Sequence, residues 1–231
     1  MNKATLTKKI NFTDDVFELQ FKTEEELTFE SGQFVTFKVD DQVPPCFRAY
    51  SISSCPEEKG QSFATCVKLV KDGRGSNWLN NLKEDQEIQY IGPNGKFIYQ
   101  DNKDNAFFIA TGTGITPFKS MIESQIEKGN KGQLSLVFGL RHISGIFYQD
   151  FFQSIKDNNP NFDFTITLSR PENDDWKGEK GRVTDYLRKQ TLDTENTNYY
   201  ICGLKAMIDE VTTILKEKGI PDENVHFEKF D

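Results

Sequence analysis

The stretch Ile109-Ala110-Thr111-Gly112-Thr113-Gly114-Ile115-Thr116-Pro117 decides how the second half of the chain folds. It joins a short apolar segment to a segment with helical periodicity. Gly112 and Gly114 permit a tight turn and the close approach of a ligand, and Pro117 suits the first turn of a helix. Position 117 carries proline where the full dinucleotide fingerprint has its third glycine. The order of strand, glycine turn and helix still predicts a ligand site at the carboxyl end of a parallel strand.

The remainder of the chain after residue 104 alternates between short β-prone segments and helical patterns. The predicted strands cover residues 106–110, 134–138, 162–168, 199–202 and 225–228. One predicted helix starts near Pro117, and three further helices are predicted over residues 148–155, 183–190 and 206–218. Alternation of this kind predicts βαβ units and a parallel sheet.

The first hundred residues follow a different pattern, in which short strands are separated by acidic residues, glycine or proline. The predicted strands cover residues 5–10, 16–22, 33–39, 49–53, 63–70 and 88–91, with one short helix at 77–82. Six such strands predict a closed antiparallel barrel. We therefore expect two domains of β and α/β class, an antiparallel barrel over residues 1–101 and a parallel-sheet domain over residues 102–231.

Charge and hydropathy narrow the classes of partner. The formal net charge is −8 over 231 residues, and neither half is basic, so we expect no nucleic-acid partner. No apolar run is long enough to cross a bilayer, and the first ten residues are polar and basic without an apolar stretch behind them. We expect a cytoplasmic monomer that does not bind membranes.

Cysteine and histidine usage argues against a metal centre. The four cysteines lie at positions 46, 55, 66 and 202 and form no C-x-x-C pair, so no iron–sulfur cluster or structural zinc is predicted. Only two histidines are present, which disfavours a His-based metal site or a Ser–His triad.

Two neighbouring segments of the barrel half carry groups suited to a phosphate-bearing heterocycle. In Arg48-Ala49-Tyr50-Ser51 the guanidinium offers a planar fork to a diphosphate and the phenol ring offers a flat surface. The strand at Cys66-Val67-Lys68-Leu69 leads to Arg74-Gly75-Ser76 at a helix start, where backbone N–H groups can bind an anion. Taken singly, the first segment is more often an ordinary surface pair, and the second a plain hairpin or a Ser76 N-cap.

Three arginines are expected on one rim of the α/β half. Arg141 follows Phe138-Gly139-Leu140, Arg170 follows Ser169, and Arg182 precedes a helix. Together they would suit an additional phosphate such as the 2′-phosphate of NADPH, although each alone could be a solvated surface residue. Cys202-Gly203 ends another strand and should open on the same edge of the sheet.

The order of these motifs resembles that of the ferredoxin–NADP⁺ reductase superfamily, and the compact bacterial ferredoxin and flavodoxin reductases in particular. R-A-Y-S is followed by D-G-x-G-S, G-P-N-G-K-F, A-T-G-T-G-I-T-P, F-G-x-R, S-R and I-C-G, with an aromatic residue near the end. The resemblance covers essentially the whole chain. It implies an FAD-binding barrel and an NAD(P)-binding α/β domain.

The resemblance also implies roles for single residues. Arg48 would pair with the FAD pyrophosphate, Tyr50 would cover one face of the flavin and Ser51 would lie near its N5. The rest of the FAD would be held by Ala49, Cys66, Val67, Lys68, Leu69, Arg74, Gly75 and Ser76. The nucleotide would be contacted by Thr113, Gly114, Arg141, Ser169, Arg170, Arg182, Cys202 and Gly203. Thr113 would also reach the flavin, Cys202 would lie beside the nicotinamide and Phe230 would shield the other flavin face. Ser51, Cys202 and Phe230 are thus the implied catalytic residues.

The activity implied is hydride transfer from NADPH or NADH to FAD, with electrons then passed to a separate acceptor such as ferredoxin or flavodoxin. The segment 171–180 resembles the looser loop of NADH-using relatives, which keeps the nucleotide open. Two alternatives within enzymes are an NADH-dependent reductase component of an oxygenase and a free-flavin reductase. A third, from another class, is a non-catalytic flavin subunit of an electron-transfer complex.

Overall fold

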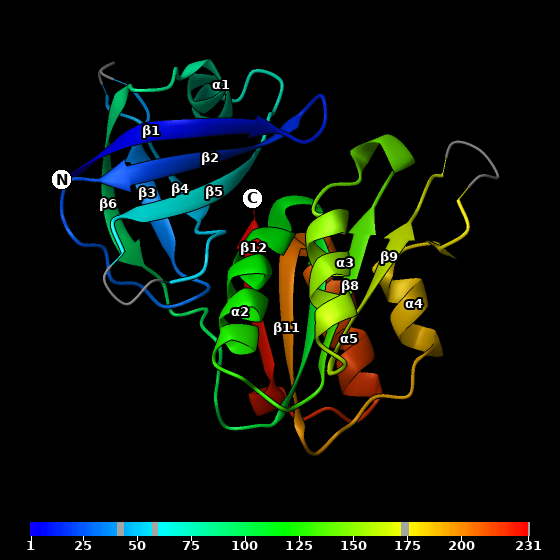
Figure 1. Cartoon of the computed structure of the whole chain (residues 1–231). Helices are drawn as coiled ribbons and strands as arrows, with labels where there is room; N and C mark the ends of the chain where they lie inside the picture. The colour runs from blue at the N-terminus through cyan, green and yellow to red at the C-terminus, as the bar shows by residue number, and fades with distance from the viewer. Residues whose placement is uncertain (41–43, 57–59, 172–175, 231) are drawn as a thin grey trace. The chain divides into compact units, whose positions relative to one another are not determined.

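The computed structural model describes residues 1–40, 44–56, 60–171 and 176–230, and these form two compact units that Figure 1 draws. Unit 1 contains Met1–Tyr99 together with Thr116–Ser124, and unit 2 contains Gln100–Ile115 and Gln125–Asp231. Unit 1 therefore includes one helical segment, Thr116–Ser124, that comes from the second half of the sequence. The domain boundary expected after residue 101 stays a prediction.

Unit 1 is built on a six-stranded antiparallel sheet, as predicted. Its strands run in the order β4-β3-β6-β1-β2-β5. Their bounds are β1 Asn2–Asn11, β2 Val16–Thr23, β3 Phe34–Lys38, β4 Phe47–Ser51, β5 Ser62–Lys68 and β6 Glu87–Asn94. The two ends of this order meet through Ser53, whose N–H donates to Ala64 O at 2.8 Å, and through Thr65, whose Oγ1 donates to Ser51 O at 2.8 Å. These hydrogen bonds close the sheet into a barrel.

Alternation along the strands fills the barrel with aromatic rings. Phe21 stacks on Phe63 at 5.1 Å and lies 5.3 Å from Phe37, and Phe63 lies 5.3 Å from Tyr90. Successive side chains of a strand point to opposite faces, so the residues next to each of these rings point out of the barrel. Burial of such rings is a large apolar contribution to stability.

The short helix α1, Arg74–Asn81, starts three residues earlier than the sequence pattern indicated. Gly73 is its N-cap, so the expectation that Ser76 could cap the helix is wrong. Ser76 lies inside the first turn, where its hydroxyl accepts from Val70 N at 3.0 Å. The side chain thus stabilises the loop that precedes the helix instead of its first amides.

Unit 2 is a six-stranded parallel sheet in the order β10-β9-β8-β7-β11-β12. The strands are β7 Asn105–Thr111, β8 Leu134–Leu140, β9 Phe162–Leu168, β10 Glu179–Lys180, β11 Thr197–Leu204 and β12 Val225–Phe230. The α-helices after β6 are α2 Thr116–Glu127, α3 Gln149–Asn158, α4 Val183–Lys189 and α5 Lys205–Glu217. Short 3₁₀ turns are η1 Gly112–Ile115, η2 Ile143–Gly145 and η3 Asp222–Asn224. The two-residue strand β10 is too short to give a periodic signal, and the sequence reading missed it.

Helices cover both faces of this sheet (Figure 1). On one face, Val183 and Leu187 of α4 and Ile208 and Val211 of α5 pack into a cluster with Ile109 of β7. On the other, Phe152 of α3 lies against the rings of Phe162 and Phe164 of β9 at 6.1 and 5.9 Å. All the strands point the same way, so their carboxyl ends share one edge, as the sequence predicted.

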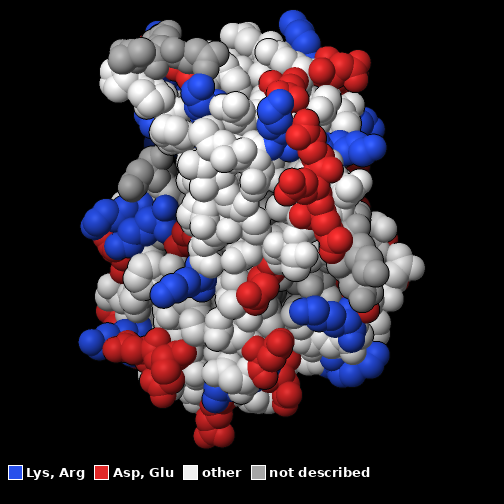
Figure 2. Space-filling view, turned by 90° about the vertical axis from the view of Figure 1, so that its left-hand side faces the viewer, with Lys and Arg blue, Asp and Glu red and all other residues white. Residues whose placement is uncertain are grey.

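No helix among the described residues is long and apolar enough to span a bilayer. On the face drawn in Figure 2, Lys and Arg side chains are interspersed with Asp and Glu side chains.

Candidate functional site

The candidate site on unit 1 is formed where β4 meets the start of α1. Arg48 lies opposite Phe37 on β3, and Tyr50 lies opposite Val35. The Tyr50 ring is 5.8 Å from that of Phe37, which holds it against the barrel core. Burial raises the pKa of Tyr50 to about 12, so its hydroxyl keeps its proton near neutral pH.

Gly75 brings the two motifs of this site together. A methyl group at position 75 would lie 2.8 Å from Cγ of Arg48 and 2.9 Å from the hydroxyl of Tyr50. Only glycine lets α1 approach β4 this closely without displacing one of those side chains. The R-A-Y-S and D-G-x-G-S segments, 27 positions apart at Arg48 and Gly75, thus share one surface.

The arginines of unit 1 differ in availability. Arg48 is exposed, and its Nη1 donates to Phe47 O at 2.8 Å. An arginine side chain has five N–H donors, so this hydrogen bond uses only one of them. Arg74 instead pairs with Asp40, with Nε donating at 2.6 Å, and this carboxylate raises the pKa of Arg74. Lys68 is likewise paired with Asp15. Arg48 is therefore the side chain best placed to meet a diphosphate.

Backbone amides at the start of α1 complete the anion-binding groups. Asn77 N donates the first intrahelical hydrogen bond, to Gly73 O at 3.0 Å, so the amides of residues 74–76 precede the helix ladder. Such amides and the positive helix end favour a phosphate. Cys66 and Val67 are buried in β5, whose backbone leads into this loop, and Leu69 N donates to Asp15 O at 2.7 Å.

The candidate site on unit 2 lies at the carboxyl edge of its sheet, and close backbone contacts define it. A methyl group on Gly114 would lie 2.2 Å from Cys202 O. Gly203 has φ of +150°, and a methyl group there would lie 2.3 Å from Oγ1 of Thr111. The turn after β7 and the end of β11 are therefore in contact through their glycines, so a ligand at this edge can approach both backbones. In the same turn, Gly112 has a φ of +54° and faces open space.

Cys202 lies at the centre of this edge but is fully buried. Burial raises the pKa of its thiol well above the usual range, and the carboxylate of Glu228 adds to the effect. A neutral, buried thiol is not a nucleophile. The backbone carbonyl of Cys202 packs against Gly114, and the buried thiol is not suited to covalent chemistry.

The arginine-bearing segments come together at one corner of the same edge. Arg170 N donates to Arg141 O at 2.8 Å, and Gly181 N donates to Leu168 O at 2.9 Å. Arg182 N donates to the Asp185 carboxylate at 2.8 Å, which anchors the start of α4. The three guanidinium-bearing residues and Ser169 are all exposed. Residues 172–175, within the loop expected to distinguish nucleotides, lie outside the described residues.

Phe230 and two threonines also belong to this edge. Phe230 pairs with Leu204 across β12 and β11, and Leu204 is 60% exposed, so an apolar pair follows the Cys202-Gly203 end. The hydroxyls of Thr167 and Thr184 are buried, and within the described residues neither has a hydrogen-bond partner. Sequence reasoning missed both, because a lone threonine in a strand or a helix carries no motif.

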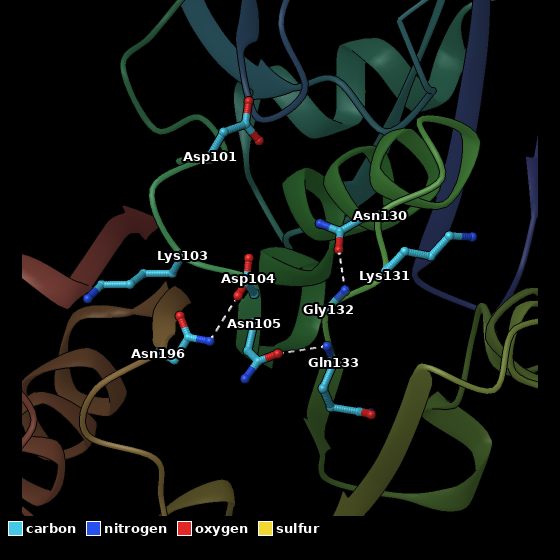
Figure 3. Close-up of a pocket in the computed structure, with 9 residues that line it drawn as sticks. All are labelled: Asp101, Lys103, Asp104, Asn105, Asn130, Lys131, Gly132, Gln133 and Asn196. Atoms are coloured by element: carbon cyan, nitrogen blue, oxygen red, sulfur yellow. Dashed lines mark hydrogen bonds between the residues drawn. The ribbon is translucent and has the colours of Figure 1, made fainter.

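The pocket drawn in Figure 3 is elsewhere. It has a volume of about 780 Å³ and is lined by residues just before β7, β8 and β11, at the amino edge of the sheet. Its side chains bind their own loops: Asn105 Oδ1 accepts from Gln133 N at 2.8 Å, and Asn196 Nδ2 donates to Asp104 at 3.1 Å. It contains none of the predicted site residues. Among the described residues, no group of three or more His, Cys, Asp or Glu side chains is arranged to hold a metal ion.

Two protein families match the chain, one in each half. Residues 3–99 match the oxidoreductase FAD-binding domain, and residues 108–213 match the oxidoreductase NAD-binding domain. The fold and the two sites thus define an oxidoreductase with one unit for FAD and one for a nicotinamide nucleotide.

Several named proteins are similar to the chain in sequence. It is 30% identical over 211 residues to the ferredoxin–NADP reductase B of Sorangium cellulosum, covering 88% of this chain and 86% of that protein. It is 30% identical to the toluate 1,2-dioxygenase electron transfer component of Pseudomonas putida, covering 89% of this chain and 60% of that protein. The chain spans about half the length of the related Na⁺-translocating NADH-quinone reductase subunits F.

Solved structures share the fold. The cytochrome P450 reductase GcoB of Amycolatopsis superposes with a TM-score of 0.90 at 21% identity, covering 99% of this chain and 69% of that one. A ferredoxin NADP⁺ reductase from Neisseria gonorrhoeae with bound FAD and NADP superposes with a TM-score of 0.85 at 19% identity, covering 98% and 97%. The two family matches and the similarity to the Sorangium cellulosum reductase show that the chain belongs to the ferredoxin–NADP⁺ reductase superfamily and is an FAD- and NAD-binding oxidoreductase.

Proposed function

We propose that the chain takes a hydride from NADPH, or from NADH, onto FAD held by unit 1 and passes the electrons to a separate protein acceptor, ferredoxin or flavodoxin. The observation that carries the proposal is that each unit has a close contact which only glycine permits, at Gly75 beside Arg48 and Tyr50 and at Gly114 beside Cys202. The residues present fit FAD: an exposed arginine fork, the backbone amides at the start of α1 and a tyrosine ring packed against the barrel core.

When bound, FAD supplies the capacity to accept a hydride and release electrons singly. The chain's own residues bind, orient and exclude water. In this proposal Arg48 and residues 74–76 hold the diphosphate, Tyr50 supports one face of the ring, and Thr113 and Gly114 take the nicotinamide nucleotide. No strong general base is required of the protein, in keeping with its scarcity of histidine.

Ser51→Ala tests the proposed role of the serine near the flavin N5. Ser51 is 4% exposed and its carbonyl is fixed by Thr65, so removing the hydroxyl leaves the backbone in place. We expect the rate of FAD reduction in stopped flow to fall by about 10- to 100-fold, since a hydrogen bond at the reacting atom is lost, while FAD stays bound. A wild-type reduction rate would show that Ser51 has no such role.

Arg170→Ala tests the choice of nucleotide. If the corner of Arg141, Arg170 and Arg182 binds a 2′-phosphate, the variant should lose about 10- to 100-fold in kcat/KM with NADPH and little with NADH. The matched control is Arg188→Ala, which removes an exposed arginine of unit 2 that pairs with Glu210 at 3.0 Å. Equal losses with the two nucleotides would refute the phosphate clamp.

The acceptor is tested by competition. NADPH oxidation is measured with ferredoxin, flavodoxin, free FMN and oxygen as rival acceptors, on protein whose FAD content is known from its absorbance. Fastest turnover with ferredoxin or flavodoxin supports the proposal. Preference for free FMN would make the chain a free-flavin reductase, and turnover only with an oxygenase partner would align it with the dioxygenase electron transfer component. The expected cytoplasmic location and monomeric state stay predictions.

A further inference from the structure

A chain of buried polar groups lies on the outer side of the barrel of unit 1. Glu18 of β2 is only 6% exposed, although its neighbours Phe17 and Leu19 point into the barrel core. Its Oε2 accepts from the hydroxyl of Ser53 at 3.1 Å, and its Oε1 accepts from Gln20 Nε2 at 3.1 Å. Ser53 itself is fully buried. A carboxyl group is thus held away from water on a surface where polar residues usually meet solvent.

A buried amine reaches the same serine from the other side. Lys119 lies in the part of α2 that belongs to unit 1, and its side chain is 12% exposed. Its Nζ donates to Ser53 O at 3.2 Å and to Glu123 Oε2 at 3.3 Å. Ser53 therefore bridges Glu18, through its hydroxyl, and Lys119, through its carbonyl. Glu18 and Lys119 thus carry opposite formal charges on two sides of one buried residue, and the Glu123 carboxylate is the ion-pair partner of Lys119.

This cluster adjoins the proposed flavin surface on two sides. Ser53 lies two residues after Ser51 and is clamped to β5 by the bond from its N–H to Ala64 O. Glu18 pairs directly with Cys66 across the β2–β5 ladder. Both Ser51 and Cys66 are among the residues proposed to contact FAD. Any charge on Glu18 or Lys119 is therefore close to that surface and is little screened by solvent.

Charged side chains at Glu18 and Lys119 are energetically unfavourable if their role is only to hold the structure together. Burying a carboxylate or an ammonium group is unfavourable unless it is paired, and neutral amide side chains could make the same hydrogen bonds to Ser53. A charge in such a place does what a neutral group does not: it shifts the electrostatic potential at the cofactor surface. Charge near a bound flavin is one of the means by which a protein tunes the cofactor's electronics.

We propose that Glu18 and Lys119 are positioning residues that hold the Ser51–Ser53 segment through Ser53 and set the reduction potential of the bound flavin with opposite signs. This inference rests on the proposed FAD site. A negative charge at Glu18 opposes the arrival of electrons on the flavin, and a positive charge at Lys119 favours it. The balance of the two fixes how readily the bound flavin takes a hydride.

The test is a redox titration of bound FAD in Glu18→Gln and Lys119→Gln. We expect the midpoint potential to rise in Glu18→Gln and to fall in Lys119→Gln. A tenfold change in the equilibrium with the nucleotide, the size expected for either variant, equals about 30 mV for a two-electron couple. Glu18→Asp and Lys119→Arg keep the charge and should stay at the wild-type potential.

Matched controls come from an exposed ion pair on the same barrel. Lys3 and Glu87 pair at 2.9 Å with side chains 44% and 49% exposed, so Glu87→Gln and Lys3→Gln make the same charge changes in solvent. Both should leave the potential unchanged. Shifts of the same sign in Glu18→Gln and Lys119→Gln, or none in either, would overturn the inference.

Two further results remain decisive. If one glutamine variant fails to fold or to retain FAD, the other decides alone, because each has its own required sign. Wild-type protein that does not bind FAD refutes the proposed function, whereas FAD-binding wild type with unshifted variants refutes only the role of Glu18 and Lys119.

Discussion

Gly114→Ala is expected to lower kcat/KM for the reduced nicotinamide nucleotide by about 100-fold, because a displacement of roughly 1 Å at a positioning turn costs that much. The added methyl group would lie 2.2 Å from Cys202 O, and the atom it meets is backbone that cannot rotate away. The turn after β7 or the end of β11 must therefore move. The measurement is steady-state NAD(P)H oxidation with a one-electron acceptor, together with the FAD content of the purified variant.

Gly145→Ala is the control for this substitution. Gly145 also lies in unit 2, and a methyl group there would meet nothing within 4 Å. This variant should keep wild-type kcat/KM. The FAD content of Gly114→Ala should stay at the wild-type level, since FAD is proposed to bind on unit 1. Unchanged kcat/KM in Gly114→Ala would mean that the turn does not position the nucleotide.

Arg48→Ala is expected to weaken FAD binding by about 10- to 100-fold, the effect of losing charge-assisted hydrogen bonds to a diphosphate. Arg48 and Arg74 are both exposed, but Arg74 is already paired with Asp40. The dissociation constant is measured by titrating apoprotein with FAD and following flavin fluorescence.

Two companion variants separate charge from geometry. Arg48→Lys keeps the charge but loses the planar fork, so its affinity for FAD should fall between wild type and Arg48→Ala. Arg74→Ala should weaken FAD binding less than Arg48→Ala does, since the Arg74 guanidinium is held by Asp40 in the absence of any ligand. A larger loss in Arg74→Ala than in Arg48→Ala would reverse this assignment of the phosphate-binding arginine.

Much of the architecture could be predicted because it depends on local periodicity. Strands such as β3 and β6 alternate buried and more exposed positions along much of their length, and segments such as β7 are short, apolar and followed by glycine. The parallel direction of the second sheet follows from strand–helix alternation, and it places the ends of β7, β8, β9 and β11 on one edge. These properties are encoded within a few neighbouring residues.

Features that depend on partners distant in the sequence could not be predicted. The strand β10 exists only because it pairs with Thr167 and Leu168 of β9. That Arg74 is paired depends on the position of Asp40, 34 residues earlier in the chain. A motif names Arg48 and Arg74 alike, because it records residue types and not their contacts.

The nine residues from Ile109 to Pro117 show where the division falls. By itself the sequence determined a strand, a turn that needs glycine and a helix, since the conformational freedom of glycine and the fixed φ of proline are local properties. Only the tertiary structure decided that Gly114 must touch Cys202 O, and that Thr116–Ser124 packs as part of unit 1 and there brings Lys119 to Ser53. Such contacts join residues that are many positions apart, so they come into being when the chain packs.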